Sequence, residues 1–176
     1  MPSPKPTIYF FYGEDTYSIS KKINFWTEQF ALKHGGDTNI ETIEGQSLDP
    51  KEFGTNIQSL PFLAEKRLII VKDLLSSSGK DNKENAEKQR IVAEILDDAP
   101  EFCVLVFTES KVPDKRKVLF KKLSKIAQVE EFPLPSPAQL TNWIIEETLS
   151  RKGKIGRVEA EFLSSQVGPN LWQLSN

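Results

Sequence analysis

The sequence predicts an α/β protein in which a parallel β-sheet is flanked by helices and followed by a small, truncated helical domain. Short apolar runs at residues 8–12, 67–71 and 102–107 are typical of strands that are buried on both faces of a sheet. Stretches with apolar residues at helical spacing alternate with these runs, and such alternation favours a doubly wound sheet.

Helical spacing recurs three times between the expected strands. The apolar positions with this spacing are Ile19, Ile23, Trp26 and Phe30, then Ala86, Ile91, Ile95 and Leu96, then Val118, Leu119, Leu123 and Ile126. Weaker strand patterns occur at residues 40–43 and 128–132, the second as an edge strand. The polar stretch at residues 76–83 is expected to form a surface loop.

A boundary is expected near residue 135, because three prolines between residues 133 and 137 interrupt regular structure. Ser136 is a good N-cap with Gln139 at the third helical position, so a helix begins there. Further helices are expected at about residues 157–167 and from Asn170 onward, where the chain stops early in a helix. We expect an α/β domain over residues 1–135 and a partial helical domain over residues 136–176.

Composition argues against several classes of function. The 176 residues carry a net charge of −2, so no overall field attracts the chain to nucleic acid or to an acidic membrane. With one cysteine, Cys103, and one histidine, His34, a disulfide framework, a metal site or a His-dependent catalytic triad is not expected. No apolar run is long enough to span a bilayer, and the first residues lack an apolar signal core. We expect a cytoplasmic protein with no cofactor, no metal and no membrane partner.

The order of strand, glycine turn and helix at the start of the chain is that of a phosphate-binding loop, whose pattern is G-x-x-x-x-G-K-[ST]. With Gly13 as the first glycine, Ser18 takes the second glycine position, Ile19 the lysine position and Ser20 the hydroxyl position. The lysine that would reach the phosphates is absent, and acids in the turn would repel them. Asp15 is instead expected to cap the helix. We interpret this as a degenerate nucleotide site, with an ordinary strand-turn-helix as the alternative.

A second position favours the same interpretation. In phosphate-loop ATPases another apolar strand ends in an Asp that holds Mg²⁺. Here the strand at residues 67–71 ends in Lys72, with Asp73 next. A lysine would repel Mg²⁺, so a degenerate magnesium site is predicted, although charged residues are also common where a strand simply ends.

The stretch "NIQSLPFLAEKRLIIV" at residues 56–71 resembles an element of the delta subunit of the bacterial DNA polymerase III clamp loader. Three further stretches resemble motifs of that family in the same order: "IYFFYGEDTYSI", "FCVLVFTESKVPDKRKVLFKKLSK" and "LTNWIIEETLSRKGKIGRVEAEFLSSQVGPNLWQL". The resemblance covers nearly the whole chain. It departs from the family pattern where Phe62-Leu63 stands in place of the usual Leu-Phe.

The resemblance implies an AAA+-type α/β domain and a helical lid, with the family's collar domain absent. It implies a non-catalytic subunit of the DNA polymerase holoenzyme that does not hydrolyse ATP. Such a subunit binds the ring-shaped sliding clamp, the beta subunit, and opens the ring for loading onto primed DNA. Contacts with the other clamp-loader subunits would run through the missing collar. The implied clamp-binding residues are Leu60, Pro61, Phe62 and Leu63.

The same segment allows an expectation from local chemistry. Pro61 disfavours helix at Leu60, so the chain is expected to leave the preceding helix in an extended turn. Because two adjacent side chains rarely enter one core, at least one of Phe62 and Leu63 is expected to be exposed. Lys66 and Arg67 are expected to mark a polar surface nearby.

A basic run at residues 111–125 is expected to be helical, and its candidate DNA contacts are Lys115, Arg116, Lys121 and Lys122. A solvated helix face is the simpler account of these charges. Two other functions remain open at this point: a nucleotide-dependent ATPase with an unusual loop, and a generic protein-interaction domain.

Overall fold

The computed structural model describes residues 7–76 and 82–175, and its centre is a five-stranded parallel sheet with the strand order β2-β3-β4-β1-β5. The strands are β1 (Ile8–Tyr12), β2 (Ile40–Glu44), β3 (Arg67–Lys72), β4 (Cys103–Glu109) and β5 (Gln128–Glu131). The helices are α1 (Thr16–Lys33), α2 (Pro50–Gln58), α3 (Asn82–Ile95), α4 (Val118–Ile126), α5 (Pro137–Ser150), α6 (Arg157–Val167) and α7 (Leu171–Leu174), with short 3-10 turns η1 (Asp37–Asn39) and η2 (Leu96–Asp98). Of the loop expected at residues 76–83, residues 77–81 lie outside the described residues, and α3 already begins at Asn82.

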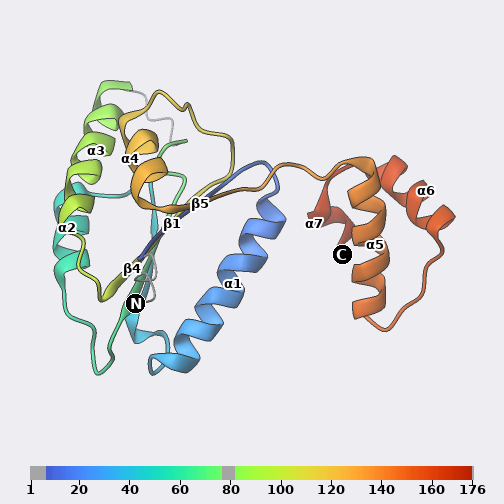
Figure 1. Ribbon diagram of the computed structural model, residues 1–176, viewed down its shortest axis with the longest axis horizontal. Coiled ribbons are helices and arrows are strands. Elements are labelled where there is room, and N and C mark those ends of the chain that lie inside the picture. The colour runs from blue at the N-terminus through green and yellow to red at the C-terminus, as the bar shows by residue number, and fades with distance from the viewer. Residues whose placement is uncertain (1–6, 77–81, 176) are drawn as a thin grey trace, which may run out of the picture.

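The sheet separates two helical layers, with α1 on one face and α2, α3 and α4 on the other (Figure 1). Neighbouring residues of β1 show how both faces are covered. Phe10 packs in the cluster that includes Phe53 of α2, whereas Phe11 packs against Ile19 and Ile23 of α1. Because helices cover both faces of β1, four of its five residues are buried and Tyr9 is partly buried, as the sequence predicts for a parallel sheet.

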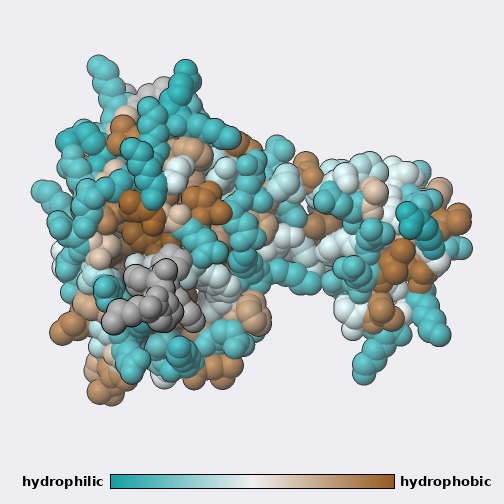
Figure 2. Space-filling model, in the orientation of Figure 1, coloured by the Kyte–Doolittle hydropathy of each residue, from teal (hydrophilic) through white to brown (hydrophobic). Residues whose placement is uncertain are grey.

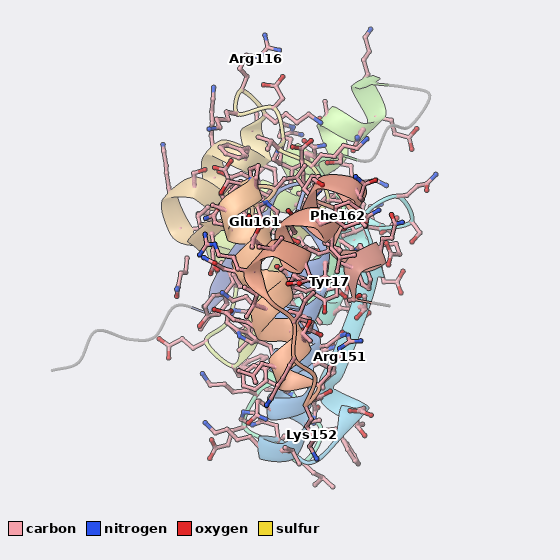
Figure 3. All side chains as sticks on the ribbon, turned by 90° about the vertical axis from the view of Figure 1, so that its right-hand side faces the viewer. Tyr17, Arg116, Arg151, Lys152, Glu161 and Phe162 are labelled. Atoms are coloured by element: carbon pink, nitrogen blue, oxygen red, sulfur yellow. The ribbon has the colours of Figure 1, made fainter. Side chains whose placement is uncertain are left out.

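Helices α5, α6 and α7 form a smaller lobe beside the sheet-containing lobe (Figure 1). The predicted capping box is present, since Ser136 and Gln139 cap the first turn of α5 through reciprocal hydrogen bonds. Tyr17 of α1 joins the two lobes: its ring centroid lies 5.6 Å from that of Trp143 and 5.1 Å from that of Trp172, both edge-on. Figure 3, which looks onto the smaller lobe, shows Tyr17 among these helices.

Gly13 lies in the three-residue connection between β1 and α1, directly under the chain that leaves β5. Its φ angle is 148°, and a Cβ atom there would lie 2.0 Å from the carbonyl oxygen of Phe132. Phe132 donates its N–H to Tyr12 O at 2.7 Å, and its carbonyl accepts from Asp15 N at 3.0 Å. The glycine is therefore required by the close approach of two backbone segments.

Replacing Gly13 by alanine is expected to lower the free energy of unfolding by about 3 kcal/mol or more, because it adds a backbone clash to a strained φ angle. Gly35→Ala is the matched control: Gly35 also has a positive φ angle, 80°, but open space at the Cβ position. That change should cost about 1–2 kcal/mol. Urea melts of both variants measure the difference, and equal losses would contradict the close approach at Gly13.

Candidate functional site

Three large apolar side chains are exposed on the loop between α2 and β3, at the edge of the sheet where the strands begin. The exposed fractions are 79% for Leu60, 66% for Phe62 and 90% for Leu63, whereas Pro61 is partly buried. The loop lies at the lower end of the larger lobe in Figure 1, and Figure 2 shows hydrophobic side chains at that end. The prediction that at least one of Phe62 and Leu63 is exposed is confirmed for both. Such a group of exposed apolar side chains is typical of a site that binds another protein.

The backbone of the loop leaves α2 abruptly and then turns outward. Ser59 is the extended C-cap of α2 and donates its N–H to Thr55 O at 3.1 Å. Pro61 keeps Leu60 out of the helical region, so the helix cannot continue. Leu63 adopts a φ angle of 50°, a left-handed conformation that is unfavourable for a branched side chain.

Asn39, from the 3-10 turn before β2, holds the centre of this loop. Its Nδ2 donates to the carbonyl oxygen of Phe62 at 2.9 Å, and its Oδ1 accepts from the N–H of Phe62 at 2.7 Å. The asparagine itself is buried. Sequence reasoning missed it, because Asn39 belongs to no motif and its partner lies 23 residues further along the chain.

Arg67, the first residue of β3, holds the start of the same loop through hydrogen bonds. Its Nη1 donates to Ser59 O at 3.2 Å, and its Nη2 donates to Glu41 Oε2 at 3.1 Å. Glu41 in turn accepts from Asn56 of α2 at 2.9 Å. The assignment of Arg67 to a polar surface is therefore wrong, since only 16% of its side chain is exposed and its charge is directed inward to these partners.

At the opposite edge of the sheet, the residues aligned with a phosphate loop have structural partners of their own. Ser18, Ile19 and Ser20 all lie inside the first turns of α1. Ile19 is buried against the sheet, and Asp15 Oδ1 accepts from Ser18 N at 3.0 Å as predicted for a cap. A phosphate bound at a helix N-terminus needs free backbone N–H groups there, and the carboxylate of Asp15 occupies this position instead.

The two charged residues at the end of β3, Lys72 and Asp73, also contact other groups of the protein. Lys72 Nζ lies 3.8 Å from Glu44 Oε1. Asp73, with a φ angle of 53°, accepts two hydrogen bonds at 2.7 Å, from the N–H and the hydroxyl of Ser110. The cavity beside them has a volume of about 190 Å³, which is below the roughly 300–1,000 Å³ of common ligand sites.

Glu109, the last residue of β4, is the buried acid of this edge. Its two carboxylate oxygens accept from Leu75 N at 2.6 Å and from Ser76 N at 2.8 Å. Burial raises the pKa of Glu109 to about 7, while these hydrogen bonds act in the opposite direction. The carboxylate ties the chain after β3 to β4, and the sequence contained no signal for it beyond a charged residue near the end of an apolar run.

The basic run is divided by the structure. Because α4 begins at Val118, Lys115 and Arg116 precede the helix and only Lys121 and Lys122 lie on it. The prediction that the whole run is helical is wrong. The reason is a turn closed by Asp114, whose Oδ1 accepts from Arg116 N at 2.9 Å.

Two of the four candidate DNA contacts already have acidic partners. Arg116 pairs with Asp114 at 2.8 Å, and Lys122 pairs with Asp97. Figure 3 shows Arg116 at the upper end of the molecule, whereas the exposed apolar loop lies at the lower end in Figure 1. The structure therefore does not bring the basic residues and the apolar loop together.

Neither a metal centre nor a membrane span is found in the part of the chain that the structure describes. Among residues 7–76 and 82–175 no three His, Cys, Asp or Glu side chains are grouped so that they could hold a metal ion. Within the same ranges, no helix has both the length and the apolar character that crossing a bilayer requires.

The strand order and the strand-glycine-helix at the end of β1 define a P-loop-like fold of the AAA+ class. The Walker-type ATPase of Pyrococcus abyssi has a TM-score of 0.57 at 11% identity, covering 97% of this chain and 61% of that one. Domain III of the Thermotoga maritima replication initiation protein DnaA also has a TM-score of 0.57, at 14% identity, covering 99% of this chain and 74% of that one. At such identities the likeness shows the fold alone.

Within this class, the chain belongs to the DNA polymerase III delta-subunit family, whose model matches residues 9–132. The DNA polymerase III subunit delta of Bacillus subtilis (strain 168) is 24% identical over 166 residues, which are 93% of this chain and 48% of that protein. The solved Bacillus subtilis DNA clamp loader delta protein has a TM-score of 0.69 at 22% identity, covering 96% of this chain and 50% of that one. The family resemblance read from the sequence is confirmed, and the chain spans about half the length of these relatives.

Titration of the chain with ATP and Mg²⁺ in a calorimeter is expected to give no saturable heat at micromolar concentrations. The cleft between the two lobes is lined by Glu14 and Asp15, which would repel phosphates, and Trp172 already donates to Thr16 Oγ1 there at 3.0 Å. Clear micromolar binding would contradict the interpretation of Gly13 and its neighbours as a degenerate site.

Glu109 predicts a specific dependence of stability on pH. Its pKa is raised from an ordinary value of 4.5 to about 7, so the folded protein holds this proton more tightly than the unfolded chain does. The free energy of unfolding should therefore fall as pH rises from about 4.5 to about 7, by up to roughly 1.4 kcal/mol per pH unit.

Urea melts of the wild type and of Glu109→Gln across that window measure this effect. The variant should lack the Glu109 contribution, while His34, whose pKa is lowered by burial, contributes the opposite slope equally in both proteins. Parallel curves for the two proteins would contradict a raised pKa for Glu109.

Proposed function

We propose that this chain is the clamp-binding part of a clamp-loader delta subunit, in which Leu60, Pro61, Phe62 and Leu63 grip the sliding clamp. In this proposal residues 1–135 form an AAA+-like domain and residues 136–176 a helical lid. The observation that carries the proposal is the outward orientation of Phe62 and Leu63 on a loop with defined backbone partners, in a member of the delta-subunit family.

Phe62 and Leu63, the two proposed anchors, are large enough to contribute substantially to the free energy of clamp binding. Full burial of one such side chain contributes about 1.5–3 kcal/mol, so two contribute roughly 3–6 kcal/mol. A binding partner shifts an equilibrium only by its difference in affinity for the two states. If a pocket on the clamp binds Phe62 and Leu63 better when the ring is open, that energy raises the ratio of open to closed rings by up to about 10²–10⁴-fold, at ~1.4 kcal/mol per factor of ten.

The chain is proposed to act without chemistry of its own. Ile19 takes the position of the phosphate-binding lysine, Lys72 takes that of the metal-holding acid, and Asp15 caps the helix where a phosphate would bind. The ATP-dependent steps would then belong to the other clamp-loader subunits, and this subunit would reach primed DNA as part of the complex.

Removing both anchors, with Phe62→Ala and Leu63→Ala together, is expected to weaken binding to the cognate sliding clamp by about a hundredfold or more. The thermal melt should stay close to that of the wild type, because side chains exposed in the free protein contribute little to its fold. Surface plasmon resonance against the immobilised clamp and a thermal melt supply the two measurements.

Val158→Ala with Phe162→Ala is the matched control, since these side chains of α6 are exposed to 74% and 64% but lie on the smaller lobe. That variant should bind the clamp as the wild type does. Wild-type affinity in the Phe62/Leu63 variant, or its unfolding, would show that this pair is not the grip.

A further inference from the structure

We propose that Asn39 is a positioning residue that holds the apolar loop in its binding shape before the clamp arrives. This inference rests on the proposed function, because it concerns how Phe62 and Leu63 are presented. Asn39 is 6% exposed and so cannot itself form much of a contact surface, whereas the loop that it holds is among the most exposed apolar parts of the described chain.

The side chain of Asn39 forms the pair of hydrogen bonds that the backbone of a neighbouring strand would otherwise form with Phe62. The amide of Asn39 pairs with both backbone groups of Phe62, at 2.7 Å and 2.9 Å. Both the N–H and the carbonyl of Phe62 are bound by Asn39 and so face the protein. The side chain of Phe62 faces solvent. The next residue, Leu63, continues outward from this fixed point with a positive φ angle.

Two local costs lie in the loop and its support. A left-handed φ angle at Leu63 is unfavourable by itself and persists only where the surroundings enforce it. Among the described residues, Arg67 Nε is a buried polar atom without a hydrogen-bond partner, although the same guanidinium holds Ser59 O. Backbone strain that persists in a native structure is often found at binding sites, where the surroundings hold the chain in shape.

Without these restraints the loop would be expected to populate other conformations. Leu60, Phe62 and Leu63 would gain by folding down onto the protein surface, and each such conformation would compete with clamp binding. The apparent affinity of a site falls in proportion to the fraction of molecules in the competent state. A residue that keeps this fraction near one therefore strengthens binding without contacting the partner.

The variant Asn39→Asp tests this with almost no change of volume. The acid keeps the acceptor for Phe62 N but loses the donor for Phe62 O, and it brings a carboxylate against that carbonyl. We expect binding to the cognate sliding clamp to weaken roughly tenfold, as it would if the competent fraction fell to about a tenth.

Gln89→Glu is the matched control. Gln89 is equally buried, and its Nε2 donates to Leu74 O at 3.2 Å, beyond the far end of β3. The same amide-to-acid change there should lower the thermal melt but leave clamp binding unchanged at temperatures well below it. Equal weakening in both variants would mean that Asn39 acts only through general stability, and would overturn the proposal.

A double-mutant cycle with Leu63→Ala separates positioning from other effects. If Asn39 acts through the loop, Asn39→Asp should weaken binding clearly less than tenfold when Leu63 is already truncated, because alanine gains less by folding onto the protein surface and the competent fraction then falls less. Full additivity, or wild-type affinity in Asn39→Asp while the Phe62/Leu63 double variant has lost binding, overturns the positioning role alone. Retained binding in that double variant overturns the proposed grip itself.

A measurement on the unaltered protein covers the case in which the Asn39 variants do not fold. The N–H of Phe62 should exchange with solvent more slowly than that of Leu63 in the free chain, because Asn39 Oδ1 accepts it. An unprotected Phe62 N–H would show that the pairing is not maintained in solution, and would overturn the proposal.

Discussion

The burial of the central strands on both faces is the constraint on which the rest of this molecule depends. Phe10 and Phe11 are adjacent and both fully buried, so each needs its own helical layer. Covering both faces of a parallel sheet requires every connection to cross from the carboxyl edge back to the amino edge. The connecting loops therefore lie at two opposite edges of the sheet, one at the carboxyl ends of the strands and one at their amino ends. The two edges differ in how their side chains are used.

The carboxyl edge is closed by the protein's own groups. Gly13 lies under the backbone of Phe132, Asp15 caps α1, and Glu109 binds the backbone after β3. The carboxylate of Asp15 occupies backbone N–H groups at the start of α1, where a phosphate would bind in a nucleotide site, and the other two contacts join neighbouring backbone segments. The amino edge differs, because there the chain fixes its backbone and leaves its largest apolar side chains in water. The contrast places the edge that is closed by the protein's own groups and the candidate binding edge at opposite ends of the sheet.

Much of the fold and the exposure of Phe62 and Leu63 could be predicted from local sequence. The strands at residues 8–12 and 67–71, the capping box at Ser136 and the cap at Asp15 all depend on periodicity or on side chains within a few positions of their partners. The error over residues 111–117 has the same local origin. The basic residues there have the same composition as the helix that follows, so the sequence predicts that they belong to it. The side chain of Asp114 instead closes a turn before α4 begins.

By itself, the sequence determined the α/β class and the position of the exposed pair Phe62-Leu63, because apolar patterning and proline restrict the backbone locally. The family followed from the resemblance of its motifs, which the family model matches. Only the tertiary structure decided what holds that pair in place. Asn39 reaches Phe62 across 23 residues, and Arg67 turns inward to Ser59 and Glu41 instead of facing solvent. The contacts of Asn39 with Phe62 and of Arg67 with Glu41 join segments that meet only when β2 and β3 align in the sheet, and no local preference of either segment encodes them.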